Sequence, residues 1–71
     1  MTAAERSIAR AEKVGRQIEE NEEYKNFALV WMGEYRLTVE NFVAVKDGIE
    51  LKITAYCDSA GNIKRLEEMP Y

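Results

Sequence analysis

The chain has 71 residues, of which 46% are hydrophobic and 32% are charged, and its formal net charge is -3. This length allows one domain with one small core, and the apolar content is too high for a disordered chain. A single cysteine and the absence of histidine exclude an internal disulfide and a zinc site built on these ligands. We therefore expect one α+β domain over residues 1–71 that binds no metal ion and no cofactor.

The charge pattern also bears on location and partners. The first residues lack the apolar segment of a secretory signal, because Arg10, Glu12 and Lys13 interrupt them, and no stretch is long enough to span a membrane. We expect a cytoplasmic protein that does not bind membranes. The acidic balance disfavours nucleic acid as a partner, since phosphate recognition needs clustered Lys and Arg side chains.

The N-terminal residues predict an amphipathic helix. Thr2 and Glu5 have the spacing of a capping box, which places the helix start at residue 3. Ile8, Val14 and Ile18 recur at helical spacing among small residues, and charged residues fall on the other faces. The helix should end near residue 22 and pack closely against a sheet through this narrow stripe.

The rest of the chain predicts an antiparallel β-meander. Residues 25–32, 35–45 and 49–57 are rich in β-branched and aromatic residues and are separated by turn signals. Residues 63–69 fit a bulged edge strand and a short helical turn equally well, so both alternatives remain open. The predicted fold class is an N-terminal amphipathic helix packed on a three- to four-stranded antiparallel β-meander.

The turns determine which residues face each other. We expect a three-residue hairpin loop at 46–48, because it sets Val45 opposite Ile49 and keeps one face apolar, whereas a two-residue turn would oppose Val45 to Glu50. A two-residue turn at 33–34 should set Ala28 opposite Val39. Asn41 interrupts the apolar face and suggests a bulge at that position.

This register divides the sheet into an aliphatic face and an aromatic face. The aliphatic face should pack on the helix and comprises Ala28, Val30, Met32, Leu37, Val39, Val43, Val45, Ile49, Leu51, Ile53 and Ala55. The alternative is that the helix covers the aromatic face instead. Since both faces of 27–32 are apolar, either arrangement leaves apolar surface that a second copy or a larger partner would cover.

The aromatic face is the candidate protein interface. Its predicted residues are Phe27, Leu29, Trp31, Arg36, Phe42 and Tyr56, which include the types enriched in interface hot spots. We expect a non-catalytic protein-interaction module, with a homodimer that stacks two sheets face to face as the simplest assembly. A separate acidic strip of Glu19, Glu20, Glu22 and Glu23 is either a solvated helix end or a docking strip for a basic partner.

Two other functions stay open as alternatives. One is a phage or mobile-element inhibitor of a nucleic-acid-handling complex, an anti-CRISPR-like protein, whose acidic strip would engage a basic surface. The other is a single-stranded nucleic-acid binder that stacks bases on Trp31 and its aromatic neighbours. An enzyme is not expected, because histidine is absent and Cys57 is predicted to be a buried, unreactive thiol on the apolar face.

Overall fold

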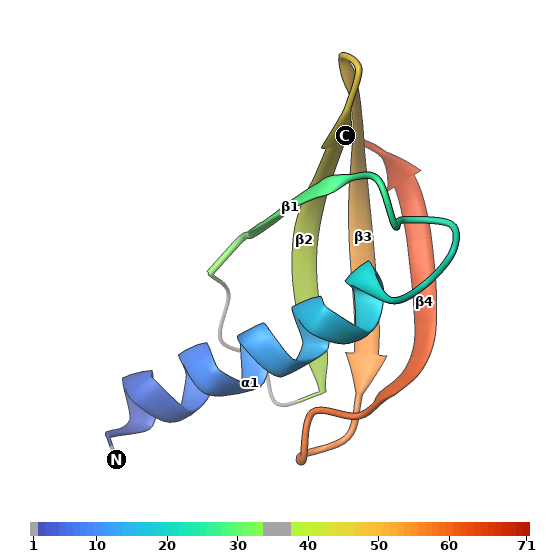
Figure 1. Cartoon of the computed structure of the whole chain (residues 1–71). Helices are drawn as coiled ribbons and strands as arrows, with labels where there is room; N and C mark the ends of the chain where they lie inside the picture. The colour runs from blue at the N-terminus through green and yellow to red at the C-terminus, as the bar shows by residue number, and fades with distance from the viewer. Residues whose placement is uncertain (1, 34–37) are drawn as a thin grey trace.

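The computed structural model of the protein, in which residues 2–33 and 38–71 are described, contains one helix and one open sheet (Figure 1). The order of the strands in the sheet follows their order in the chain, and each strand pairs with the next in the antiparallel direction. The elements are α1 (Ala3–Glu19), β1 (Ala28–Trp31), β2 (Val39–Lys46), β3 (Ile49–Cys57) and β4 (Ile63–Pro70). The predicted fold class is confirmed, and the segment after residue 62 is the bulged edge strand.

The helix begins where the sequence predicts. The Glu5 N–H donates to Thr2 Oγ1 at 3.1 Å, and the Glu5 carboxylate accepts from the Thr2 N–H at 3.4 Å, which completes the capping box. The helix ends at Glu19 and not near residue 22. Asn21 Oδ1 accepts a hydrogen bond from the Glu23 N–H at 2.9 Å, and this local bond favours a turn over another helical turn.

The predicted three-residue loop between β2 and β3 is wrong. Asp47 and Gly48 form a two-residue turn in which both residues have positive φ, 49° and 78°, as a type I′ turn requires. Lys46 therefore lies opposite Ile49, and Val45 lies opposite Glu50. The prediction weighed uniform apolar pairing above the preference of Asp-Gly for this turn, whose twist matches that of the strands.

The predicted pairing of β1 with β2 is also wrong. Ala28 lies opposite Val45 and Trp31 lies opposite Phe42, so the connection is longer than the predicted two-residue turn. The turn partner Glu34 and the neighbouring Leu37 fall outside the described residues. Asn41 pairs regularly with Thr54, and the bulge lies instead between Tyr56 and Cys57 where β3 meets β4.

These shifts reverse the predicted faces of β1 and β2. The helix covers Leu29, Trp31 and Phe42, while Val30 is 58% exposed on the other side. On β3 the prediction holds, because Ile53 and Ala55 are fully buried beneath the helix. A one-residue change of register moves a whole strand's side chains to the other face, which explains why β2 turned over and β3 did not. The alternative arrangement, with the helix on the aromatic side, is the observed one.

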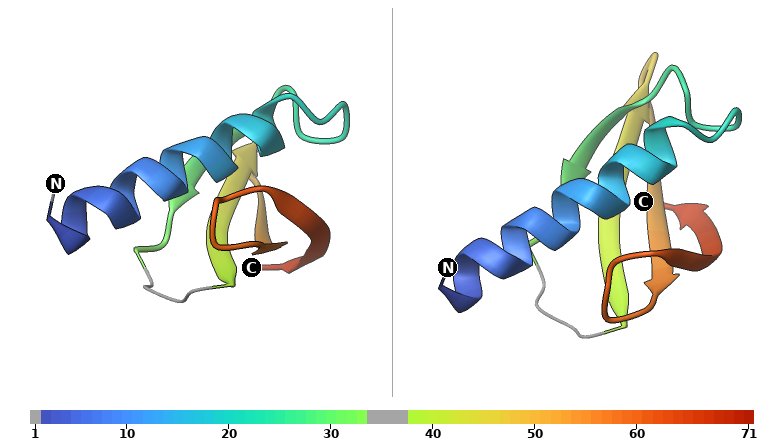
Figure 2. Two further views of the ribbon diagram at one scale, coloured as in Figure 1. Left: turned by 90° about the horizontal axis from the view of Figure 1, so that it is seen from below. Right: turned by 60° about the horizontal axis from the view of Figure 1, so that its bottom comes forward.

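The predicted helix-facing residues on β1 and β2 therefore lie on the open face or outside the core. Those described are Ala28, Val30, Val39, Val43 and Val45. The observed core consists of Val14, Ile18, Tyr24, Phe42, Ala44, Ile53, Ala55 and Cys57. Figure 2 shows the helix lying across one face of the sheet, with its first turns extending beyond the edge formed by β1.

Polar contacts hold the helix to the turn between β3 and β4. The Gln17 amide nitrogen donates to the Gly61 carbonyl at 2.6 Å, and its oxygen accepts from the Ile63 N–H at 3.0 Å. Lys13 Nζ donates to the Ala60 carbonyl at 2.9 Å. We call these contacts the Gln17 clamp. Because Gln17 uses both its amide oxygen and its nitrogen here, its contact fixes the height of the turn along the helix.

Candidate functional site

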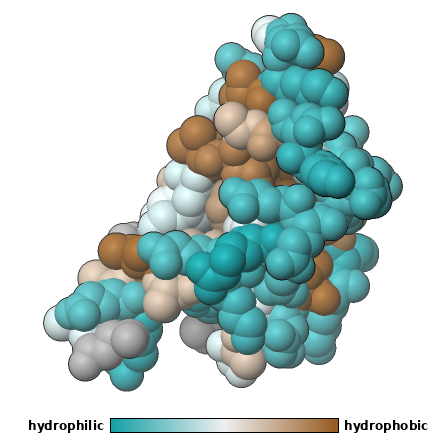
Figure 3. All heavy atoms as spheres, in the orientation of Figure 1, coloured by the Kyte–Doolittle hydropathy of each residue, from teal (hydrophilic) through white to brown (hydrophobic). Residues whose placement is uncertain are grey.

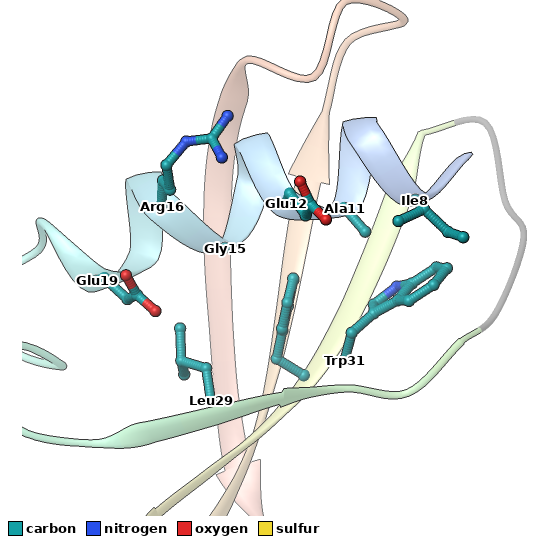
Figure 4. A pocket seen from close by; sticks show the side chains of 9 residues that line it. Ile8, Ala11, Glu12, Gly15, Arg16, Glu19, Leu29 and Trp31 are labelled. Atoms are coloured by element: carbon teal, nitrogen blue, oxygen red, sulfur yellow. The ribbon is translucent and has the colours of Figure 1, made fainter. Parts of the chain in front are cut away.

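A groove lies between α1 and the edge strand β1 and encloses about 370 Å³ (Figure 4). Figure 4 shows the side chains of the helix and of β1 converging on it from opposite sides, with Ile8 across from Trp31. The groove is lined by Ile8, Ala11, Glu12, Gly15, Arg16, Glu19, Leu29, Trp31 and Phe42. It is open to solvent and has an apolar floor with charged groups along the helix side.

Small helix residues keep this groove open. A Cβ atom at Gly15 would lie 3.4 Å from the Phe42 ring. Because glycine has no side chain, the helix backbone approaches this ring closely and no side chain at position 15 fills the space above it. Phe42 is only 4% exposed and forms the deep part of the floor, whereas Leu29 and Trp31 are half-buried along the strand. The floor is therefore apolar and only partly filled by the protein's own side chains.

The rim of the groove combines an apolar lip with charges. Ile8 is 45% exposed and stands across the groove from Trp31, the last residue of β1 (Figure 4). Glu12, Arg16 and Glu19 follow it along the exposed side of the helix. Figure 3 shows apolar surface beside the helix within a mainly hydrophilic face. An apolar centre inside a polar rim is the usual anatomy of a protein interface.

A buried polar cluster lies behind Trp31 and orients its ring. The indole Nε1–H donates to Glu40 Oε2 at 2.7 Å. Arg10 Nε lies 4.0 Å from Glu40 Oε1, and an Arg10 Nη2–H donates to Cys57 Sγ at 3.0 Å. Burial raises the pKa of the Glu40 carboxyl, while the indole hydrogen bond and the Arg10 charge oppose that shift. The fixed indole is consequently a preorganised part of the groove.

The residues of the predicted interface do not share one face. Leu29, Trp31 and Phe42 come together in the groove, on the side of the sheet that the helix covers. Tyr56 lies on the opposite face, where the Arg65 guanidinium is 4.3 Å from its ring centroid. The predicted grouping is thus wrong for Tyr56, because the faces of β1 and β2 reversed and that of β3 did not.

Two further residues of the predicted interface lie elsewhere. Phe27 precedes β1 and packs edge-on against Tyr24, with ring centroids 6.1 Å apart, while Lys46 Nζ lies 5.6 Å from the Phe27 centroid. Arg36 falls outside the described residues. In the acidic strip, Glu19 lines the groove and Glu20, Glu22 and Glu23 are exposed in and after the helix end.

The helix side of the groove and the polar cluster behind it were not predicted from the sequence. Ala11 and Gly15 are two of the small residues between Ile8 and Ile18, and nothing in the neighbouring sequence shows that the space beside them stays open. Glu40 gave no signal, because a carboxylate in a strand ordinarily faces solvent. Its burial depends on Trp31 and Arg10, which are distant in sequence.

Two other groups with chemical reactivity, Cys57 and Asp58, contribute to the fold itself. Cys57 is buried, as predicted, at 4% exposure. Asp58 accepts hydrogen bonds from Asn62 and Ala60 within its turn, and those from Asn62 hold its pKa below the ordinary value. Over residues 2–33 and 38–71, no group of three or more His, Cys, Asp and Glu side chains is arranged to hold a metal ion.

Comparisons with known proteins add no assignment. No protein-family model, no curated protein and no solved structure matches the chain. The helix α1 is not long and apolar enough to cross a membrane, and the described residues contain no other candidate span.

Proposed function

We propose that the protein is a non-catalytic protein-interaction module that receives an apolar side chain of a partner protein in the groove between α1 and β1. The observation that carries this proposal is the lining of the groove. Leu29, Trp31 and Phe42 form an apolar floor, and Ile8 stands exposed at the lip. Aromatic groups held in a partly open apolar site are typical anchors for a binding partner.

The charges around the groove favour a basic partner segment. Glu12 and Glu19 line the rim with one opposing cation, Arg16, and the remaining acidic-strip residues continue beyond the helix end. A segment with Lys or Arg beside an apolar anchor would complement this surface, and screening by salt would weaken its binding. The same complementarity supports the inhibitor alternative, in which the basic surface belongs to a nucleic-acid-handling complex.

The nucleic-acid alternative gains no comparable support from the geometry. Base stacking needs several exposed aromatic rings on one face. Phe42 lies beneath the helix and Tyr56 lies on the other side of the sheet, so these rings do not form a common platform.

Selection from a random peptide display library tests the proposed groove. Selected peptides should carry an apolar residue flanked by Lys or Arg, and their binding should change the fluorescence of Trp31, the only tryptophan. Ile8→Glu should weaken their binding at least about tenfold, since it places a charge at the lip of an apolar interface.

Ala9→Glu is the matched control, because residue 9 is exposed on the same helix but does not line the groove. It introduces the same charge and should change the affinity less than about twofold. Equal affinity of the selected peptides for wild type and Ile8→Glu would refute the groove as the binding site.

A further inference from the structure

Strand β4 forms the edge of the sheet opposite to β1 and carries an ordered sequence of charges (Figure 1). Lys64 and Arg65 precede Leu66, and Glu67 and Glu68 follow it; all four charged residues are exposed. Two cations before a central apolar residue and two anions after it make the strand self-complementary when it runs antiparallel to its own copy. This pattern bears on the self-association that the sequence suggested.

The backbone of β4 restricts how a copy can pair with it. The Tyr71 N–H donates to the Glu50 carbonyl at 3.1 Å, so Tyr71 is a hydrogen-bonded partner of β3. Because such positions alternate in an antiparallel ladder, the backbone groups of Leu66 and Glu68 point away from β3, toward the outer edge. Pro70 has the same orientation, which agrees with its lack of an N–H.

Only registers that oppose outward-pointing residues to one another can form a new ladder. With Leu66 opposite its own copy, Arg65 lies opposite Glu67 of the second copy, and Glu67 lies opposite its Arg65. In the neighbouring registers of the same kind, Arg65, Glu67 or Glu68 would lie opposite its own copy and bring like charges together. Among these registers, only the one centred on Leu66 satisfies both the backbone and the charges.

We propose that two copies of the chain pair antiparallel through β4, with Leu66 at the two-fold axis, to form a continuous eight-stranded sheet. Both helices then lie on the same side of this sheet. Lys64 has no partner in β3 at the bulge and marks the end of the regular pairing, near Glu68 of the second copy. The interface is isologous, as in most homodimers.

The charged side chains central to this pairing are exposed, although the Arg65 guanidinium also lies over the Tyr56 ring. Arg65 and Glu67 lie 3.6 Å apart within the strand, but they are 64% and 54% exposed, so this ion pair contributes little to stability. The Tyr24 hydroxyl donates to Glu68 Oε2 at 2.6 Å and holds that carboxylate on the helix side of the sheet. Pairing with a copy thus exchanges a weak contact within the strand for two contacts across the two-fold axis.

Sedimentation equilibrium on charge-reversal variants tests the pairing. The wild type should dimerise at concentrations from about 10 to about 500 micromolar, a range suited to a small interface. Arg65→Glu and Glu67→Arg, taken singly, should each weaken dimerisation roughly tenfold or more, because each places like charges opposite one another twice per dimer. An equimolar mixture of the two variants should recover the wild-type association.

The outcomes separate this proposal from the proposed groove function, because β4 contributes no residue to the lining of the groove. Arg6→Glu, on the exposed first turns of the helix, reverses a charge far from β4 and should leave dimerisation unchanged. A wild-type dimer insensitive to Arg65→Glu would place self-association on another surface. A wild-type monomer at about 500 micromolar would overturn pairing through β4, while peptide binding in the groove would be judged by its own experiment.

Discussion

At the scale of single residues, Glu40 is the most demanding side chain of the fold. Its carboxyl is 3% exposed and is placed between the Trp31 indole and the Arg10 guanidinium. Arg10 Nε is itself buried and has no hydrogen-bond partner among the described residues, so the ion pair compensates only part of the cost of burying two charges. The buried charges that hold the indole in position therefore lower the stability of the fold.

Because burial raises the pKa of Glu40, the cost of burying its charge can be measured as a dependence of stability on pH. The folded protein holds the proton above the ordinary pKa of 4.5, so this group's contribution to stability is full below that value and is lost as pH rises through the folded pKa. Glu40→Gln cannot ionise, and its free energy of unfolding should therefore gain on that of the wild type as pH is raised through the range above about 4.5. Urea denaturation across this range provides the measurement.

The pKa of Asp58 is shifted in the opposite direction, so this residue affects stability in a different pH range. Its pKa lies below the ordinary 3.8, so its contribution is lost only as pH falls through the lower folded pKa. The two effects consequently do not overlap above pH 4.5. For the Glu40 experiment, the contradicting result is a free energy of unfolding that changes with pH in the same way for wild type and Glu40→Gln. That result would show that burial does not raise the pKa of Glu40.

At the scale of elements, the sequence predicted what depends on neighbouring residues. The capping box determined the helix start, and the run of β-branched residues at 49–57 matched β3 in both bounds. Pairing was harder to predict, because 27–32 and 42–45 are apolar on both faces and periodicity cannot choose between them. The groove could not be predicted either, since its floor depends on which face the helix covers.

The turn that determines the β2–β3 register gives a direct test at this scale. Gly48 has a φ of 78° with no atom within 4 Å of a Cβ at this position, so a side chain would meet strain but no clash. Gly48→Ala should destabilise the protein by about 1 kcal/mol, whereas Gly48→Asn should cost less because asparagine tolerates positive φ. Equal stabilities of these two variants in urea denaturation would contradict the type I′ turn.

At the scale of the whole molecule, one helix covers one face of a four-stranded sheet and leaves the other face open. On the open face, β1 and β2 carry two apolar pairs. Ala28 lies opposite Val45, and Val30 lies opposite Val43. The composition anticipated that a chain of this length cannot bury both faces. It did not indicate that one edge would be apolar and grooved and the other charged.

Cys57 reports on opening of the whole fold. Its thiol lies beneath the helix, and it belongs to the buried core. Alkylation by iodoacetamide should be at least about a hundredfold slower in the folded protein than in urea, since reaction requires the core to open. A cysteine introduced at exposed position 71 in a Cys57→Ala background should react equally fast in both conditions. Similar alkylation rates for Cys57 in the folded protein and in urea would contradict the burial of this thiol in the core.

The Gln17 clamp has a consequence for synthesis on the ribosome. The ribosome makes the helix well before the groups that hold Gln17, because the Gly61 carbonyl and the Ile63 N–H follow Gln17 in the chain by 44 and 46 residues. A nascent chain that ends before these residues lacks the Gln17 clamp, although it already contains the Arg10–Cys57 contact between the helix and β3. The Gln17 clamp is therefore expected to form only after residue 63 has left the exit tunnel, later than the contacts of the helix with β1, β2 and β3.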